Sequence, residues 1–80
     1  MNLLILSIKN IIEYKNASIL NVKTYLKLFS IMNNHINNIC DVNQIKLIFK
    51  NKIINIRINN GFLFQKKNNT KIICNFYEFL

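Results

Sequence analysis

The spacing of the apolar residues changes partway along this chain of 80 residues, and that change does most to limit its fold. Between residues 3 and 14, apolar side chains recur at helical spacing, which predicts a helix there. Residues 17–23 are partly β-branched and flanked by polar residues, which favours a strand. Residues 24–35 return to helical spacing, with Thr24 as the candidate N-cap, and the asparagine-rich run at 33–38 is typical of a helix end.

From Ile36 onward the apolar residues move toward a period of two, which is typical of strands. Alternation is cleanest at 54–58 and also marks 45–49, 62–64 and 72–76, with short turns expected at 50–52, 60–61 and 67–70. We therefore predict an α+β fold, in which a helix–strand–helix unit precedes an antiparallel β meander of about four strands. One domain is expected over residues 1–80, with an α/β half at 1–42 and a β-rich half at 43–80.

The only glycine of the chain, Gly61, follows Asn60 between two alternating runs, and there is no proline. An Asn-Gly pair in this position is a strong signal for a type I′ hairpin turn, in which both central residues take positive φ. Glycine adopts such φ values freely because it has no Cβ. The sequence therefore predicts a tight turn at Asn60-Gly61 that joins two strands.

The chain is strongly basic: eleven Lys and Arg against three Asp and Glu give a formal net charge of +8. Such a balance is typical of proteins that bind polyanions. The abundance of Asn, Ile and Lys also indicates a gene from an AT-rich genome, so codon bias is an alternative source of the lysines. Bias alone explains the charge poorly, because Glu also has AT-rich codons and is nearly absent.

The sequence offers little for catalysis or metal binding. Its three carboxylates are scattered at Glu13, Asp41 and Glu78, and His35 is its only histidine. Cys40 and Cys74 form no metal-binding motif and are expected to be packed thiols. We predict a protein that is not an enzyme and has no cofactor or metal. No apolar stretch reaches the ~20 residues of a transmembrane helix, and no signal peptide is recognised, so neither a span nor a cleaved leader is expected.

Two segments resemble the small-subunit ribosomal protein eight family. The stretch LSIKNIIEYKNASILNVKTYLK, residues 6–27, is similar to the start of that family, whose first helix carries an isoleucine–base–asparagine triplet, here Ile8-Lys9-Asn10. Gly61 stands where that family has a loop glycine, and Lys71–Cys74 stand at its last strand. The resemblance implies a reduced, non-catalytic scaffold that binds small-subunit rRNA beside neighbouring ribosomal proteins, in a mitochondrion or a plastid.

Basic and polar residues at loops and strand ends are the candidate RNA-binding positions, because lysines contact phosphates and asparagines can bond bases or 2′-hydroxyls. Two alternatives stay open: another basic organellar ribosomal protein, or a small structural subunit of an organellar membrane complex. The candidate RNA-binding residues are Lys9, Asn10, Lys15, Lys23, Thr24, Arg57, Asn59, Asn60, Gly61, Lys66, Lys67 and Lys71.

Overall fold

The protein folds as eight β-strands, and no helix occurs in the part of the chain that the structure describes. The computed structural model describes residues 1–31 and 35–80, with the backbone alone at 35–37. The strands, in chain order, are β1 (Asn2–Leu6), β2 (Ile11–Tyr14), β3 (Ile19–Lys23), β4 (Leu28–Ile31), β5 (His35–Ile48), β6 (Ile53–Lys67), β7 (Asn69–Ile73) and β8 (Phe76–Phe79).

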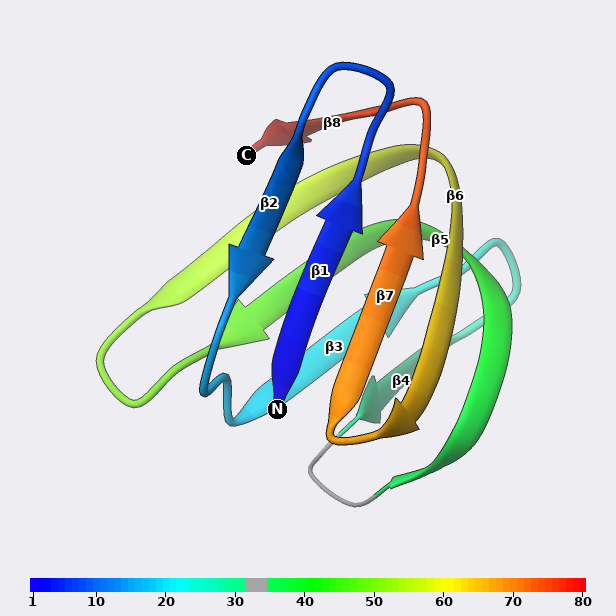
Figure 1. Cartoon of the computed structure of the whole chain (residues 1–80). Helices are drawn as coiled ribbons and strands as arrows, with labels where there is room; N and C mark the ends of the chain where they lie inside the picture. The colour runs from blue at the N-terminus through cyan, green and yellow to red at the C-terminus, as the bar shows by residue number, and fades with distance from the viewer. Residues whose placement is uncertain (32–34) are drawn as a thin grey trace.

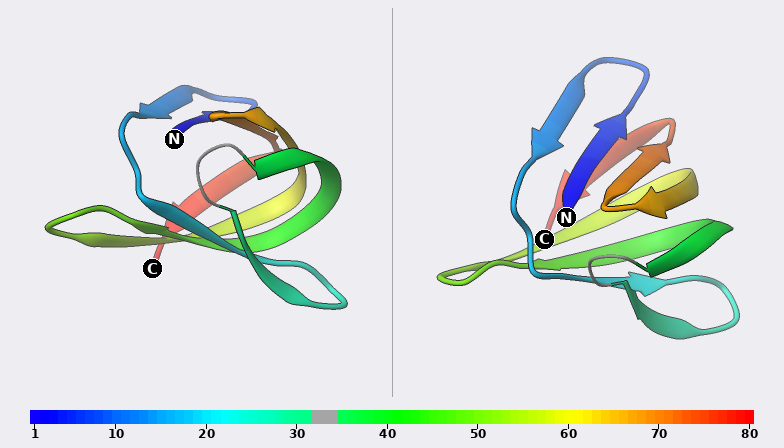
Figure 2. Two further views of the ribbon diagram at one scale, coloured as in Figure 1. Left: turned by 90° about the horizontal axis from the view of Figure 1, so that it is seen from below. Right: turned by 60° about the horizontal axis from the view of Figure 1, so that its bottom comes forward.

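All eight strands belong to one hydrogen-bonded sheet that folds over into two layers (Figures 1 and 2). Its order is β2-β1-β7-β6-β5-β3-β4, with β8 paired to β6. The long strands β5 and β6 run through both layers. The first layer consists of β2, β1, β7 and the halves of β6 and β5 at residues 61–67 and 35–42. The second layer consists of β8, β3, β4 and the remaining halves of β6 and β5.

The core lies between the layers, because alternate residues of each strand point inward. Leu3, Ile5 and Leu63 contribute from the first layer, and Leu20 and Leu47 from the second. All five side chains are fully buried. Burying a side chain of this size stabilises the fold by about 1.5–3 kcal/mol, so the alternation of these strands holds the two layers together.

The turn predicted at Asn60-Gly61 is wrong, because β6 continues through these residues. Val42 pairs with Gly61 and Gln44 with Arg57, so β6 carries extra residues at this point, a bulge where the two strands bend between the layers. Asn60, with φ 49°, takes the positive φ, and Gly61 does not. A Cβ on Gly61 would collide with the Ile58 side chain and lie 3.0 Å from Cγ1 of Val42, so close packing is what requires glycine.

The helix predicted at 3–14 is wrong: this segment is the hairpin β1–β2, whose turn is closed by Ser7 and Asn10. Two residues of the predicted apolar stripe, Ile8 and Ile11, are 79% and 66% exposed. Of that stripe Ile5 is buried, and the other buried position is Leu3, two residues earlier, at strand spacing. Helical spacing in a short apolar run is also compatible with a strand. Residues 2–6 form a strand here because they pair with β7.

The helix predicted at 24–35 is also wrong for its described residues, which form the β3–β4 turn and then β4. Residues 32–34 lie outside the described residues, and His35 begins β5. Thr24 does cap the chain, but in a hairpin: its Oγ1 accepts hydrogen bonds from the N–H groups of Leu26 (3.1 Å) and Lys27 (3.0 Å). The predicted α+β fold class is therefore wrong, because the described residues form an all-β sheet.

Other predictions for the chain are confirmed. The strand expected within 17–23 is β3, and the alternating runs at 45–49 and 54–58 lie in β5 and β6. The turn at 50–52 closes with a hydrogen bond from the Phe49 N–H to the Lys52 carbonyl. The turn expected at 67–70 is shorter, since β6 ends at Lys67 and β7 begins at Asn69. The division of the domain at residue 42 stays a prediction.

Candidate docking face

The outward side of the first layer is unusually apolar, and we call it the first-layer outer face. It consists of the outward positions of β2, β1, β7, β6 and β5. Among these, Ile39 is 71% exposed, Phe62 56% and Ile73 47%. Its described members are Asn2, Leu4, Leu6, Ile11, Glu13, Ile39, Asp41, Phe62, Phe64, Lys66, Asn69, Lys71 and Ile73.

The strand register arranges these side chains in rows that cross the sheet. In one row, Leu6 lies opposite Ile11 on one side and Ile73 on the other, and Ile73 lies opposite Phe62. Four apolar side chains are therefore direct cross-strand neighbours on a surface that faces outward. In the next row, Lys71 lies between Leu4 and Phe64, and Phe64 lies opposite Ile39.

The outward side of the second layer is different, because its central row is polar. Lys46 lies opposite Asn55 and Asn21, and Asn21 lies opposite Ser30. The Ser30 hydroxyl donates to Oδ1 of Asn21 at 2.6 Å. One row over, Arg57 donates to Oε1 of Glu78 at 2.8 Å. The second layer also exposes Leu28, Ile53 and Phe76 beside this polar row. The first layer differs because its apolar row crosses four strands without a polar residue, which makes it the stronger candidate for a partner surface.

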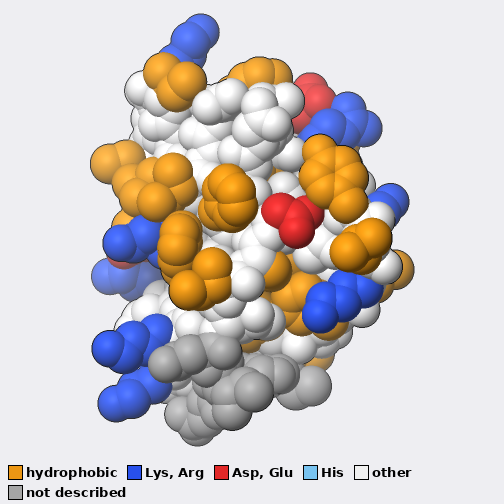
Figure 3. Space-filling view, turned by 90° about the vertical axis from the view of Figure 1, so that its right-hand side faces the viewer, with side chains coloured by type: hydrophobic (Ala, Val, Ile, Leu, Met, Phe, Trp, Pro, Cys, Tyr) orange, Lys and Arg blue, Asp and Glu red, His pale blue; other side chains and the backbone are white. Residues whose placement is uncertain are grey.

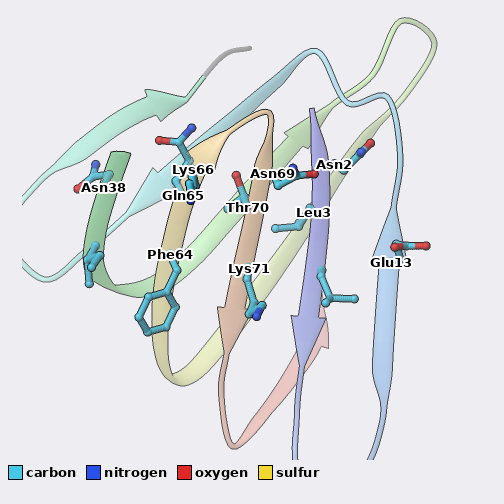
Figure 4. A pocket seen from close by; sticks show the side chains of 12 residues that line it. Asn2, Leu3, Glu13, Asn38, Phe64, Gln65, Lys66, Asn69, Thr70 and Lys71 are labelled. Atoms are coloured by element: carbon cyan, nitrogen blue, oxygen red, sulfur yellow. The ribbon is translucent and has the colours of Figure 1, made fainter. Parts of the chain in front are cut away.

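A groove of about 480 Å³ crosses the first-layer outer face (Figure 4). Phe64 and Lys71 project outward from the neighbouring strands β6 and β7 (Figure 4). Lys71 lies opposite Leu4 of β1, which also lines the groove. Three buried residues at the alternate positions, Leu3, Gln65 and Thr70, also line it. The groove is lined by Asn2, Leu3, Leu4, Glu13, Asn38, Ile39, Phe64, Gln65, Lys66, Asn69, Thr70 and Lys71.

The charges at the groove are mostly positive. Lys66 and Lys71 line it, and neither forms an ion pair with a described residue. Glu13, the carboxylate at its β2 end, lies 3.9 Å from the ammonium group of Lys15. Viewed from the side of β5 and β6, hydrophobic side chains gather on the surface, with an acidic side chain among them and basic side chains around them (Figure 3). The face therefore combines apolar contact area with two lysines that form no ion pair with a described residue, and it also carries the carboxylates of Glu13 and Asp41.

The described residues hold no cluster that could bind a metal ion. No group of three His, Cys, Asp or Glu side chains comes together there. Burial raises the pKa of the Cys74 thiol, and burial together with Asp41 raises that of Cys40, against a smaller opposite effect of Lys27, so neither thiol is activated. Both cysteines are free, and His35 has no described side chain. No helix in the described residues is long and apolar enough to cross a membrane.

The candidate RNA-binding residues are spread over the molecule. Lys9 and Asn10 lie in the β1–β2 turn, and Lys15 follows β2. Lys23 ends β3, and Thr24 follows it. Asn59, Asn60 and Gly61 lie at the bend of β6, and Lys67 ends that strand. Arg57 belongs to the second layer and is paired with Glu78. Of the twelve, the groove brings together Lys66 and Lys71. No finding tests their contact with RNA, which stays a prediction.

Sequence reasoning missed the apolar members of the face, chiefly Leu4, Ile39, Phe62, Phe64 and Ile73. A signal was present, because uninterrupted apolar runs such as Gly61–Phe64 and Ile72–Cys74 predict strands that are apolar on both sides. In a strand that has the core on one side only, apolar residues alternate with polar ones. These runs therefore indicated a second covered face.

Comparison with known proteins gives a fold match. No family model and no curated protein matches the sequence. A chain in a cryo-EM structure of the Tetrahymena thermophila mitochondrial ATP synthase, described as central stalk and c-ring, has a similar fold with a TM-score of 0.80 at 15% identity. The match covers 98% of this chain and 65% of that chain, so this chain spans slightly less than two thirds of its neighbour.

The predicted membership of the small-subunit ribosomal protein eight family is wrong, and with it the small-subunit role and the rRNA and ribosomal-protein partners. The matched chain belongs to an ATP synthase, and the helix–strand–helix that the resemblance requires is a pair of hairpins here. The triplet Ile8-Lys9-Asn10, expected in a helix, falls in the β1–β2 turn. Short motifs of Ile, Lys and Asn arise easily in a chain dominated by these residues.

Proposed function

We propose that this chain is a non-catalytic subunit of a mitochondrial ATP synthase-type complex, in which it binds neighbouring subunits through the first-layer outer face. The observation that carries the proposal is that apolar face, which lies on a fold matched over nearly its whole length by a chain of such a complex. Apolar patches that span several strands are typical of protein interfaces. The proposal takes up the alternative of a small subunit of an organellar membrane complex.

The chemistry of the described residues favours assembly over catalysis. They hold no cluster of acid, base or nucleophile, and their groove offers lysines, amides and apolar side chains. A groove of that composition can hold a polypeptide but has no group poised for proton transfer. We therefore assign the chain no reaction of its own within the complex.

Mitochondrial location and partners follow from the same proposal. The structural neighbour comes from a mitochondrial complex, in a structure described by its central stalk and c-ring. The abundance of Asn, Ile and Lys indicates an AT-rich gene, which is compatible with an organellar genome. The partners of this chain would then be other subunits of the ATP synthase, and its positive charge would favour acidic surfaces on them.

The proposal is tested by purifying the tagged chain from mitochondria in mild detergent and identifying its companions by mass spectrometry. We expect subunits of the ATP synthase at fixed stoichiometry, with recovery unchanged by ribonuclease. A variant with Phe62→Asp on the apolar face should lose these companions, whereas Asn55→Asp on the polar second layer should keep them. Recovery with ribosomal subunits, or equal recovery of the complex with both variants, would contradict the proposal.

A further inference from the structure

The groove on the first-layer outer face has a direction that limits what it can hold. It crosses the strands, because its lining residues come from β2, β1, β7, β6 and β5 in their order within the sheet. Neighbouring strands lie about 4.8 Å apart, so four intervals give a groove about 19 Å long. An occupant of this groove must therefore be an elongated segment lying at a large angle to the strands.

The surface of the groove also limits the backbone of its occupant. The strands beneath it use their backbone groups in the sheet, so a partner meets side chains there and no free row of N–H and C=O groups. A segment lying there must satisfy its own backbone hydrogen bonds, which an α-helix does and an extended strand does not. At a rise of 1.5 Å per residue, about 13 helical residues fill a length of 19 Å.

The charges of the lysines at the groove indicate whether its occupant is a second copy of this chain or a different protein. Lys71 lies between Leu4 and Phe64, with Lys66 at the edge of the groove, and neither is neutralised by a described residue. A second copy would bring another net charge of +8 to the same place. This chain has only three carboxylates, so an acidic segment of another protein offers these lysines more charge-assisted contacts without that repulsion.

We infer that the groove binds an amphipathic α-helix of another subunit, with apolar side chains against Leu4, Ile39 and Phe64 and carboxylates opposite Lys66 and Lys71. This inference rests on the proposed function, since it names the kind of segment that the first-layer outer face receives. The helix contributes about three and a half turns of contact, with apolar positions three and four residues apart.

The first experiment places a photoreactive amino acid at Phe64 in the chain assembled in its complex. The matched control carries the same amino acid at Lys46, which is exposed on the second layer. After irradiation, the cross-linked peptides are sequenced by mass spectrometry. We expect Phe64 to yield one peptide of another subunit, with apolar residues at helical spacing and Asp or Glu flanking them, and Lys46 not to yield it.

The second experiment reverses one charge on each face. Lys71→Glu should weaken incorporation into the complex about tenfold, the loss typical of a contact near the centre of an interface, whereas Lys46→Glu should change it less than about twofold. Circular dichroism of both purified variants checks that each remains folded. If Lys71→Glu does not fold, Lys71→Gln, which removes the charge alone, serves in its place.

The outcomes separate this inference from the proposed function. If the chain copurifies with the ATP synthase but Phe64 cross-links to a second copy, to lipid, to RNA or to a peptide without acidic helical character, the helix inference fails and the subunit role stands. Equal effects of the two charge reversals overturn it in the same way. If the chain is absent from the complex, the proposed function fails first.

Discussion

At the scale of single residues, close packing and hydrogen bonding explain features that composition does not. Gly61 is the only glycine, and a Cβ there meets the side chains of Ile58 and Val42 and lies 3.2 Å from the Val42 carbonyl oxygen. Thr70 is 3% exposed, and its Oγ1 has no hydrogen-bond partner among the described residues. Thr24 is similarly buried, but its hydroxyl is bonded. For each of these three residues, the structure predicts whether a substitution raises or lowers the free energy of unfolding.

Gly61→Ala should destabilise the protein by about 1–3 kcal/mol, because the added methyl group overpacks the bend of β6. Urea unfolding followed by circular dichroism measures the loss. The neighbouring change Asn60→Gly is the control: Asn60 already has positive φ, so glycine there should alter stability by less than about 1 kcal/mol. An alanine variant as stable as the wild type would show that the bend relaxes around the extra carbon.

Thr70→Val should leave stability unchanged or raise it by up to about 1 kcal/mol, since it replaces a buried hydroxyl that lacks a partner with a methyl group of similar shape. The same urea titration tests it. A loss above 1 kcal/mol would mean that the hydroxyl forms a bond in solution, to water or to residues beyond the described ones. The matched comparison is the same substitution at Thr24.

At the scale of elements, hairpins replace the predicted helices because local hydrogen bonds and neighbouring strands both favour them. The β3–β4 turn is closed by a backbone bond between Thr24 and Lys27, and the Tyr25 N–H donates weakly to Oδ2 of Asp41 at 3.4 Å. The Thr24 side chain adds two acceptor bonds to the same turn. Beyond it, β3 pairs with β5 as well as β4, which fixes the hairpin against the sheet.

Thr24→Val should cost about 1–2 kcal/mol, because it removes the acceptor for the N–H groups of Leu26 and Lys27 in a partly buried turn. Thr24→Ser keeps the hydroxyl and should recover most of that loss. Thermal and urea unfolding of the three proteins provide the measurement. If valine and serine have equal effects, the turn does not depend on the side-chain hydroxyl.

At the scale of the whole molecule, two layers share one core while their outer faces differ. The inner side is sealed by residues from both layers, as the buried cluster shows. The outer side of the second layer has a polar central row, and that of the first layer has an apolar row that crosses four strands, with two lysines that form no ion pair with a described residue. The described residues therefore form a buried core and leave an apolar outer face exposed, which is typical of a protein that binds a partner.

Alkaline pH should destabilise the whole fold. Burial raises the pKa of the thiols of Cys40 and Cys74 above 9.0, and burial with a smaller effect of Tyr77 raises that of Tyr14 above 10.0. A raised pKa in the folded state means that the folded protein holds its protons more tightly than the unfolded chain. The stability that these groups contribute is full below the unfolded values and is lost as pH rises through the folded ones.

Urea unfolding at pH 7 and at about pH 10.5 measures this loss, with a Cys74→Ala variant as the control that removes one of the groups. The variant should be less stable than the wild type at pH 7 but should lose less stability between the two pH values. An unfolding free energy that stays constant up to pH 10.5 would contradict the expected effect of burial on these groups.

The sequence by itself determined the local features: the strands at 17–23 and 54–58, the turn at 50–52, the packed thiols and the strong positive charge. These follow from side-chain alternation, turn chemistry and composition, which act over a few residues. Only the tertiary structure decided that residues 3–14 pair with β7 as a strand hairpin, and that Asn60 and Gly61 form a bend inside β6. Short apolar runs fit either a helix or a strand, so long-range pairing had to select one.

The first-layer outer face likewise depends on the tertiary structure. Its members come from five strands spread from β1 to β7 along the chain, and their common side exists only once β1 lies beside β7. The sequence showed Phe62 and Phe64 as apolar, but register determined that they stand outward beside Ile73 and Lys71. Alternation along a strand fixes which residues share a face, and the pairing of distant strands fixes which faces become one surface.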